Sequence, residues 1–481
     1  METKQFDLIV IGAGPGGYVA ALSAAKEGMK VAVCERELVG GTCLGKGCIP
    51  TKTMLHTAEI YRNVLEGGPI GIVSQGIDVD MNALQDYKNQ VVDTLSQGIR
   101  AQFKKAKITF FEGEAKVLGT GSVKEVAVGE ERISADKLLI ATGSAPVRLP
   151  IPGMELPGVW NSDQILENRE KLDSLTIIGG GVIGMEFASL YAALGTKVTV
   201  IEALDRILAT LDKDFGQNLK LILKKQGVEI ITSAFLKEIR AEEIEGKTEL
   251  ICRYELKGRE SRNKSEESAQ PVIGEVRSEK VLVAVGRRAN TAGLFAETLG
   301  EAQLPKLERG KILVDDRFET SIPGIYAIGD VIGGIQLAHA ASAEGENAVA
   351  AMLGKKLPYR MDVVPSCVYT QPEIASVGLS FDEAKEKGLD AVQLKYVMGA
   401  NGKTVLTRQP RSFLRIVVTR KEGRILGAQF MCARATDMIG EFASAIVNGL
   451  TCKEMAAAIR PHPTFNEAIG EALRSWTEEE E

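Results

Sequence analysis

The chain is poor in the residue types that build metal sites. It has 481 residues, only three of them histidines, and one closely spaced pair among its seven cysteines, Cys43 and Cys48. The other cysteines lie singly, at positions 34, 252, 367, 432 and 452. Structural zinc sites need four Cys or His ligands. A lone C-x-x-x-x-C pair could form half of such a site, but nothing completes it, so the sequence predicts no bound metal.

Long apolar runs and an excess of positive charge are also missing. The most membrane-like stretch, Leu175 to Leu194, contains four glycines and Glu186, which argues against a transmembrane span. The net charge is −6 with a pI of about 5.6, so electrostatics do not favour nucleic acid as a partner. The first residues lead directly into an apolar run, with no room for a targeting segment, and we expect a cytoplasmic protein.

A glycine-rich turn near the start indicates a nucleotide-binding site. The apolar run FDLIVI is followed by Gly12, Gly14 and Gly17 in a G-x-G-x-x-G pattern and then by an alanine-rich stretch. These glycines permit a tight turn, close approach of a pyrophosphate and close helix–strand packing. The next strand, VAVCE, ends in Glu35, which can accept hydrogen bonds from ribose hydroxyls. The helix N-terminus favours a diphosphate.

The same pattern returns in the middle of the chain with Gly179, Gly181 and Gly184, and its second strand, KVTVIE, ends in Glu202. Each glutamate lies 18 residues after the last glycine of its motif. One such motif is weak evidence, but two complete copies are specific. A carboxylate at position 202 favours NAD because it would repel the 2′-phosphate of NADP. Arg206 is the nearby cation that argues the other way.

Cys43 and Cys48 follow the first nucleotide motif. Five positions can close into a small disulfide if the turn brings the Cα atoms within roughly 7 Å. Pro50 suits the first turn of a helix, which would place Cys48 at the positive helix end, where a thiolate is stabilised. Most intracellular cysteines are reduced and inert. The neighbouring nucleotide site nevertheless favours a redox pair that exchanges electrons with a bound cofactor.

Several motifs in a fixed order make the chain similar to the disulfide-reducing flavoenzymes with two nucleotide-binding domains. Within these it most resembles the dihydrolipoamide dehydrogenase family, from about residue 5 to about residue 475. The motifs are GGTCLGKGCIPTK (40–52), ATG (141–143), AVGRR (284–288), YAIGD (326–330), LAHAASAEG (337–345) and PHPTFNE (461–467). Gly45, Lys46 and Thr51 depart from the residues common in the first motif.

The resemblance implies an α/β fold with two Rossmann-like nucleotide-binding domains, for FAD and NAD, and a C-terminal α/β dimerisation domain. We expect an FAD-binding domain over 1–150, an NAD-binding domain over 151–283, a central segment completing the FAD site over 284–357, and an interface domain over 358–481. The residues expected at FAD are Gly12, Gly14, Gly17, Glu35, Arg36, Gly41, Thr42, Cys43, Lys52, Ala115, Thr142, Gly143, Asp330 and Ala338. Those expected at NAD are Gly179, Gly181, Val182, Ile183, Gly184, Glu202, Val285 and Gly286.

The same resemblance places Lys52 beside the reactive edge of the flavin, paired with Glu186. Glu186 could instead be a solvated helix residue, but its apolar surroundings favour a buried, partnered carboxylate. Asp330 is implied to hold the ribityl or phosphate region of FAD, and backbone near Ala338 the ring system. Without the resemblance, Asp330 could equally cap the next helix.

His462 is the second catalytic centre that the sequence suggests. Pro461 and Pro463 stiffen its backbone, and a histidine titrates in the range that a base for a thiol needs. Glu467 could orient the ring and stabilise its cation. A histidine trapped in a proline-rich turn is the alternative; the family motif favours catalysis. The resemblance implies that His462 and Glu467 reach the disulfide of the other subunit in a homodimer.

The implied reaction is oxidation of protein-bound dihydrolipoamide to lipoamide with reduction of NAD, through Cys43, Cys48 and FAD. The implied partner is the lipoyl-bearing protein of a 2-oxo acid dehydrogenase or glycine-cleavage system. One alternative is another NAD(P)H-dependent disulfide reductase, similar to glutathione reductase. Another is a non-catalytic flavoprotein subunit. No cysteine follows Cys452, which argues against mercuric and large thioredoxin reductases.

Between the motifs we expect four further features. They are a helical stretch from Met54 to Lys107, a solvated loop over the polar residues 257–280, strands near FLRIVV and ILGAQF with helices after Asp437, and a frayed tail over the final TEEEE.

Overall fold

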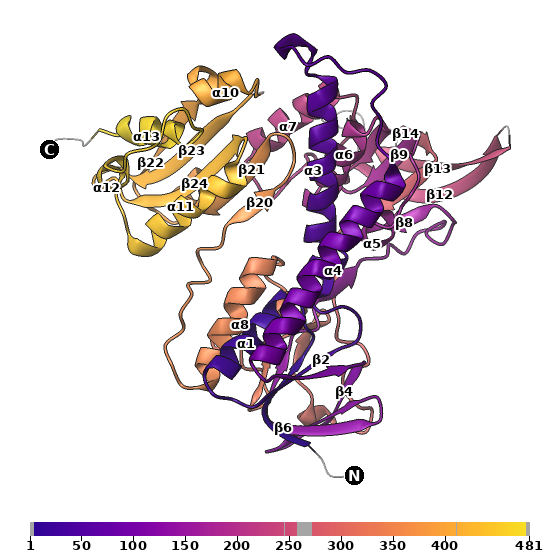
Figure 1. Ribbon diagram of the computed structural model, residues 1–481, viewed down its shortest axis with the longest axis vertical. Helices are drawn as coiled ribbons and strands as arrows, with labels where there is room; N and C mark the ends of the chain where they lie inside the picture. Colours follow the sequence, from indigo (N-terminus) through magenta and orange to yellow (C-terminus); the bar gives the residue numbers. More distant parts are fainter. Residues whose placement is uncertain (1–3, 245, 257–271, 410, 478–481) are drawn as a thin grey trace, which may run out of the picture.

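The computed structural model describes residues 4–244, 246–256, 272–409 and 411–477, and builds them around three principal β-sheets (Figure 1). The final glutamates of the predicted tail and residues 257–271 of the predicted loop lie outside these ranges. None of the helices within them has both the length and the apolar character needed to cross a bilayer. The same residues contain no cluster of three His, Cys, Asp or Glu side chains suited to a metal ion.

The first sheet contains the first glycine-rich turn at the end of its central strand, β1. Strands β1, β2, β3, β6 and β19 run parallel, and β4 and β5 are antiparallel additions next to β6. The apolar run predicted as a buried strand is the buried half of β1. The strands of this sheet are β1 (Lys4–Ile11), β2 (Val31–Glu35), β3 (Thr109–Glu112), β4 (Ala115–Thr120), β5 (Lys124–Val128), β6 (Glu131–Ile140) and β19 (Ile325–Ala327).

Two helices from opposite ends of this region pack closely on the sheet. They are α1 (Pro15–Lys26) and α8 (Ala338–Met352), which lie side by side in Figure 1. A Cβ on Gly345 would lie 2.7 Å from the Gly16 carbonyl oxygen, so only glycine allows this helix spacing. The pairing of β19 with β6 and of α8 with α1 brings residues 325–352 back to the first nucleotide motif.

The second sheet repeats the design with the second glycine-rich turn after its central strand, β9. All five strands are parallel, in the order β11-β10-β9-β15-β8. They are β8 (Val159–Asn161), β9 (Ser174–Ile178), β10 (Lys197–Ile201), β11 (Glu229–Ile231) and β15 (Lys280–Val283), with helices α5 (Ser162–Ile165), α6 (Val182–Ala193) and α7 (Lys213–Lys225).

A three-stranded antiparallel sheet extends from this unit and corrects one prediction. Its strands are β12 (Ala234–Ile244), β13 (Lys247–Leu256) and β14 (Val272–Ser278), so the described end of the predicted 257–280 loop is a strand. Its polar residues make cross-strand ion pairs, for example Arg240 with Glu275 at 2.7 Å. The polarity of β14 therefore reflects a solvated sheet face and not a loop.

The C-terminal sheet is antiparallel throughout, in the order β20-β21-β24-β23-β22. The strands predicted at FLRIVV and ILGAQF are confirmed as β23 and β24, and the predicted helices follow from Ala435. The elements are β20 (Ser366–Val368), β21 (Glu373–Gly378), β22 (Ala391–Val397), β23 (Phe413–Thr419), β24 (Ile425–Cys432), α9 (Phe381–Glu386), α10 (Gly402–Leu406), α11 (Ala435–Asn448), α12 (Cys452–Ala456) and α13 (Glu467–Arg474).

Two long helices, α3 (Cys48–Leu65) and α4 (Met81–Lys105), connect the first sheet to the other units (Figure 1). The prediction of one helical stretch over residues 54–107 is wrong in that this region contains two separate helices. The segment between the helices contains Gly67, Gly68 and Pro69, which interrupt regular helix with a short 3₁₀ turn at Gly68–Ile70. His56 lies within α3 and His339 in the first turn of α8, as expected.

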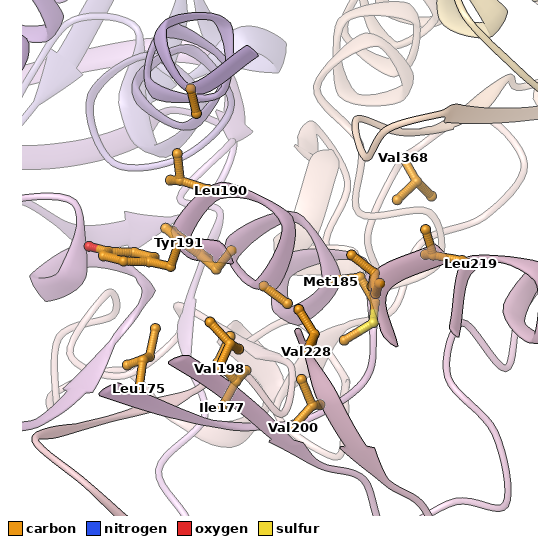
Figure 2. Close-up of a cluster of buried hydrophobic side chains, with 14 of the residues drawn as sticks. Leu175, Ile177, Met185, Leu190, Tyr191, Val198, Val200, Leu219, Val228 and Val368 are labelled. Carbon is orange, nitrogen blue, oxygen red and sulfur yellow. The ribbon is translucent and has the colours of Figure 1, made fainter. Parts of the chain in front are cut away.

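One hydrophobic core joins the three regions behind the site. It contains Met54 of α3, Met185 and Leu190 of α6, Leu219 of α7, and Val368 of β20. Figure 2 shows Val368 reaching toward Leu219 and Met185 from the C-terminal strand. Each such fully buried side chain contributes about 1.5–3 kcal/mol. The elements that carry the candidate site residues are thus held by shared packing.

Candidate active site

A single cavity of 2930 Å³ runs from the first glycine-rich turn, past the two cysteines, to the second turn. All the residues predicted at FAD and NAD line it except Gly17 and Gly184. Cys43, Cys48, Lys52 and Glu186 line it as well, whereas His462 and Glu467 do not.

Gly17 and Gly184 lie beneath their turns, where each helix meets its strand. A Cβ on Gly17 would lie 1.9 Å from the Gly12 carbonyl oxygen, and one on Gly184 would lie 2.0 Å from that of Gly179. Any side chain there would push the helix away from the strand. Both glycines therefore affect the cavity indirectly, because they allow the glycine-rich turn that lines it to keep its shape.

The two glutamates at the ends of β2 and β10 make the same contacts in both units. Glu35 accepts hydrogen bonds from the backbone N–H groups of Ala13 at 2.7 Å and Glu37 at 2.9 Å. Glu202 accepts from Gly180 and, at 2.6 Å, from Leu204. Each carboxylate thus binds the second residue of its glycine-rich turn and fixes the turn against the strand end.

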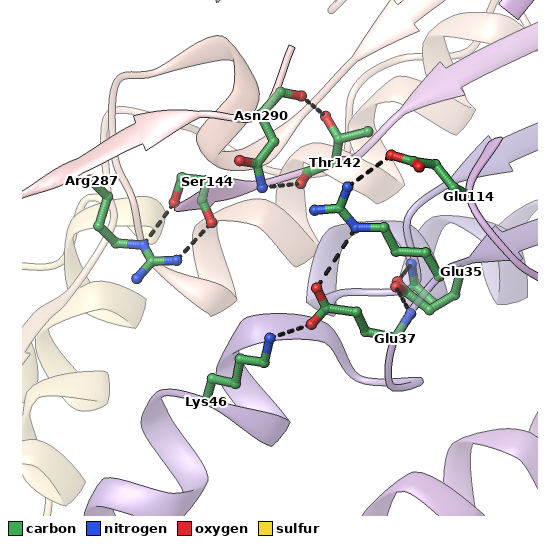
Figure 3. A network of polar contacts seen from close by, with 10 residues as sticks. Glu35, Glu37, Lys46, Glu114, Thr142, Ser144, Arg287 and Asn290 are labelled. Atoms are coloured by element: carbon green, nitrogen blue, oxygen red, sulfur yellow. Dashed lines mark hydrogen bonds and ion pairs between the residues drawn. The ribbon is translucent and has the colours of Figure 1, made fainter. Parts of the chain in front are cut away.

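Charged residues follow Glu35 along the cavity wall. Arg36 lies 3.7 Å from Glu37 and 3.1 Å from Glu114, and Lys46 forms an ion pair with Glu37 (Figure 3). In the second unit, Arg206 donates to the Ala209 carbonyl at 3.0 Å.

Cys43 and Cys48 are brought together by two consecutive helices. Cys43 lies in the short helix α2 (Gly41–Gly45), and Cys48 is the first residue of α3, as Pro50 predicted. Both are free thiols in the structure, and they hydrogen-bond each other. The hydrogen bond from Cys43, together with the Lys52 cation, lowers the pKa of Cys48 to about 7. The hydrogen bond to Cys48 and burial raise the pKa of Cys43. Of the two sulfurs, Cys48 is therefore the one that ionises first as the pH rises.

Lys52 and Glu186 form the predicted pair across α3 and α6. Lys52 Nζ lies 2.7 Å from Glu186 Oε2, and the glutamate side chain is only 5% exposed. The prediction of a buried, partnered carboxylate is confirmed. Tyr369 also contacts the pair: its backbone N–H donates to Glu186 Oε1 at 3.0 Å, and Lys52 Nζ lies 4.5 Å from its ring centroid. The sequence analysis missed Tyr369 because no local spacing connects it to α3 or α6.

Asp330 lies in the 3₁₀ turn Gly329–Ile332 and faces side chains from two other segments. It accepts a hydrogen bond from Ser144 and lies 3.8 Å from Arg287. Arg287 also donates to the Ser144 hydroxyl and carbonyl, each at 2.7 Å (Figure 3). The helix-capping alternative for Asp330 is wrong, because Leu337 occupies the N-cap of α8.

Thr142 is tied to the same wall by Asn290. Its hydroxyl donates to the Asn290 carbonyl at 2.7 Å, and the Asn290 amide donates back to the Thr142 carbonyl at 3.1 Å (Figure 3). Sequence analysis did not identify Ser144 or Asn290 as site residues. Ser144 directly follows the ATG motif and Asn290 lies two residues after the AVGRR motif, and this closeness is the signal that could have found them.

His462 and Glu467 form a second polar centre outside the cavity. His462 Nδ1 lies 2.8 Å from Glu467 Oε1, and Glu467 Oε2 accepts from the Thr464 N–H at 2.9 Å. The Thr464 N–H and the histidine lower the pKa of Glu467. Because a carboxylate only accepts, Nδ1 carries a proton, and in the neutral ring Nε2 is then the acceptor. The His462 side chain is 78% exposed, so its free nitrogen is open to a partner or substrate.

Sequence comparison identifies the group of proteins to which this site belongs. A family model described as pyridine nucleotide-disulphide oxidoreductase matches residues 6–345. The chain belongs to this family. The model of the family's dimerisation domain matches residues 364–473, the region of the C-terminal sheet.

Individual relatives of the chain cover nearly its full length. A dihydrolipoyl dehydrogenase of Bacillus subtilis (strain 168) is 40% identical over 97% of this chain and 97% of its own. A dihydrolipoyl dehydrogenase of Geobacillus stearothermophilus is 36% identical over 97% of this chain and 95% of its own. Among solved structures, the HOCl-induced flavoprotein disulfide reductase RclA from Escherichia coli is 28% identical, with a TM-score of 0.82 over 97% of this chain and 99% of its own. LpdA from Mycobacterium tuberculosis, at 24% identity and a TM-score of 0.85 over 98% and 100%, shares the fold.

Pyridine nucleotide-disulphide oxidoreductases of the dihydrolipoyl dehydrogenase type use FAD and NAD(H), and the residues present here fit both. The starts of α1 and α6 face the cavity with Gly14 and Gly181 as their N-caps, so backbone N–H groups are available to a diphosphate without obstruction. Glu35 and Glu202 line the same cavity at the ends of β2 and β10. The predicted fold class and cofactors are confirmed, and the chain is an oxidoreductase.

Proposed function

We propose that this protein oxidises the dihydrolipoyl group of a lipoyl-bearing protein to the cyclic disulfide and reduces NAD to NADH. The observation that carries the proposal is the thiol pair with divided pKa values, located in one cavity between two nucleotide-binding turns. The similarity to dihydrolipoyl dehydrogenases over almost the whole chain supports the substrate.

The reaction begins with Cys43 and Cys48 joined as a disulfide, the oxidised form of the pair. His462 Nε2 removes the proton of one substrate thiol, and the resulting thiolate attacks Cys43 Sγ. This breaks the Cys43–Cys48 bond, forms a mixed disulfide and releases Cys48 as a thiolate. The second substrate thiol then displaces Cys43 Sγ, which takes a proton, and the substrate leaves as its cyclic disulfide. Two electrons have passed from substrate to the cysteine pair.

The environment of each sulfur suits its part. Cys48 leaves easily because its thiolate is stabilised by Lys52 and by the start of α3. The hydrogen bond from Cys43 adds to this stabilisation once Cys43 is again a thiol. Cys43 holds its proton more tightly and is the thiol that the substrate displaces last. FAD, when bound, carries the two electrons from the cysteine pair to NAD. Glu202 favours NAD over NADP because its carboxylate would repel a 2′-phosphate.

A homodimer completes the site in this proposal. His462 and Glu467 lie outside the cavity that contains Cys43 of the same chain, and they belong to the dimerisation domain. A two-fold dimer would carry this pair from one subunit to the cysteine pair of the other. Glu467 keeps the histidine proton on Nδ1 and so leaves Nε2 ready as the base.

The proposed partner is the lipoyl domain of a 2-oxo acid dehydrogenase or glycine-cleavage system, in the cytoplasm, where other thiols are kept reduced. A swinging lipoyl group must reach the base from outside the subunit. The 78% exposure of His462 in the single chain supports such an approach.

The test is a pair of assays on purified, FAD-loaded protein. Dihydrolipoamide with NAD should give rapid NADH formation, and glutathione disulfide with NADPH should give none. Cys48→Ser should abolish the first activity. Turnover only with glutathione disulfide and NADPH would instead indicate a glutathione reductase-like enzyme and a misread Glu202. Turnover with neither pair would favour a non-catalytic flavoprotein subunit.

A further inference from the structure

Tyr369 reaches the Lys52–Glu186 pair from the C-terminal sheet. The two carboxylate oxygens of Glu186 have different partners: Oε2 accepts from the Lys52 ammonium at 2.7 Å, and Oε1 accepts from the Tyr369 backbone N–H at 3.0 Å. The Tyr369 ring covers the same ammonium, with Nζ 4.5 Å from its centroid. Tyr369 therefore contacts Glu186 through its backbone and Lys52 through its ring.

Tyr369 is itself held firmly in place. The preceding residue, Val368, is 1% exposed and belongs to the core that also contains Met185 of α6 (Figure 2). The following residue, Thr370, is buried, and its hydroxyl donates to the Pro372 carbonyl at 2.8 Å. The ring thus projects from a fixed backbone into the cavity that Cys48 also lines.

The position of the Lys52 ammonium matters because the charges of Lys52 and Glu186 have opposite effects on the pKa of Cys48. Lys52 favours the Cys48 thiolate and Glu186 opposes it. A lysine side chain has a flexible four-carbon stem, and its head is strongly hydrated. Lys52 is 30% exposed, so its head needs further contacts to stay in one place. The ring face of Tyr369 supplies such a contact in addition to the ion pair with Glu186.

We propose that Tyr369 is a positioning residue that holds the Lys52 ammonium beside Cys48 and thereby sets the reactivity of the Cys48 thiolate. This inference rests on the roles proposed for Cys48 and Lys52. It means that the dimerisation region takes part in the redox centre of its own chain. The titratable groups that surround Tyr369 and Cys48 are Cys43, Lys52, Glu186, Cys367 and Glu373.

The test measures the pH dependence of Cys48 alkylation in FAD-loaded protein that has been reduced and freed of reductant. Iodoacetamide labelling of the Cys48 peptide is followed by mass spectrometry. In Tyr369→Leu the midpoint should rise by about 0.5–1 pH unit, because the ammonium loses the ring face and gains freedom and water. Tyr369→Phe keeps the ring and should keep the wild-type midpoint. Tyr87→Leu, at an exposed position of α4, is the matched control and should also leave it unchanged.

A second series does not depend on the stability of the leucine variant. Phenylalanines carrying one, two or three ring fluorines at position 369 keep the shape but weaken the negative ring face stepwise. The midpoint should rise with each fluorine. A flat series, an unchanged midpoint in Tyr369→Leu, or equal shifts in the Leu and Phe variants would overturn the proposal. Labelling uses no dithiol substrate or NAD, so a failure here is separate from a failure of the dihydrolipoamide assay.

Discussion

Cys43 and Cys48 are identical in side chain but differ in protonation because their surroundings differ. Cys48 begins helix α3, accepts a hydrogen bond from Cys43 and has Lys52 one turn further along the same helix. A lowered pKa means that the thiolate is present above about pH 7 and is lost as the pH falls through that value. The position of Cys48 at the start of α3 and the Lys52 cation thus help to give the two cysteines different pKa values.

Lys52→Met should raise the pKa of Cys48 by about one unit, because the variant removes the cation and leaves the Glu186 carboxylate opposing the thiolate. The check is the midpoint of Cys48 alkylation against pH in the reduced protein. Lys46→Met is the matched control, since Lys46 is an exposed lysine that pairs with Glu37. An unchanged midpoint in Lys52→Met would show that the hydrogen bond from Cys43 alone sets the pKa.

Glu344 of α8 is a buried carboxylate below the Asp330 turn. It accepts a hydrogen bond from the Gly329 N–H at 2.6 Å, and burial raises its pKa to about 7. A raised carboxyl pKa means that the folded state binds this proton more tightly than the unfolded state does. The group therefore destabilises the fold progressively as the pH rises from about 4.5 to about 7.

Glu344→Gln should remove this pH dependence, because a glutamine oxygen still accepts from Gly329 but never ionises. Relative to wild type, the variant should gain stability between pH 5 and pH 8, by up to about 3 kcal/mol. The check is the thermal midpoint of both FAD-saturated proteins over that range. A difference between the two midpoints that stays constant with pH would contradict this account of Glu344.

At the scale of elements, the chain uses one device twice: a strand, a glycine-rich turn, a helix, and a second strand whose terminal glutamate binds the turn. Glu35 binds the N–H of Ala13 and Glu202 that of Gly180. A Cβ on the third glycine of either turn would overlap a carbonyl oxygen of the same turn, so a substitution in one turn should disturb its own site and not the other.

Gly17→Ala should lower the FAD content of the purified protein at least about tenfold, whereas Gly184→Ala should weaken NADH binding by a similar factor and leave FAD in place. Each added methyl would lie about 2 Å from a carbonyl oxygen and move the helix start. The measurements are flavin absorbance per protein and NADH titration by fluorescence. Gly98→Ala in α4, with no atom near its added Cβ, should change neither. Loss of both cofactors in both variants would mean global unfolding instead.

The structural features that could be predicted from the sequence are those set by residues close together in the chain. The strand–turn–helix order around Gly12 and Gly179 and the start of α3 near Pro50 have local signals, and the structure confirms them. The contacts of Tyr369 with Lys52 and of Arg287 with Ser144 have no such signal, because they join segments far apart in sequence. The polar strand β14 was predicted as loop because its stabilising partners, such as Arg240, lie on another strand.

At the scale of the whole molecule, one chain contains all the proposed parts but does not bring them together. The cysteine pair and both nucleotide turns share one cavity, while His462 and Glu467 lie outside it in the region that matches the dimerisation domain. In the proposed mechanism each working site therefore needs two chains, because the base of one subunit serves the cysteine pair of the other.

The most direct test combines two inactive variants, Cys48→Ser and His462→Gln. Chains carrying different affinity tags are produced together, and the mixed dimer is isolated through both tags. It is then assayed with dihydrolipoamide and NAD. Each parent dimer should be inactive or reduced by at least about 10²-fold. The mixed dimer has one site with both an intact cysteine pair and an intact partner histidine, so it should show about half the wild-type activity. A mixed dimer as inactive as its parents would contradict the shared site.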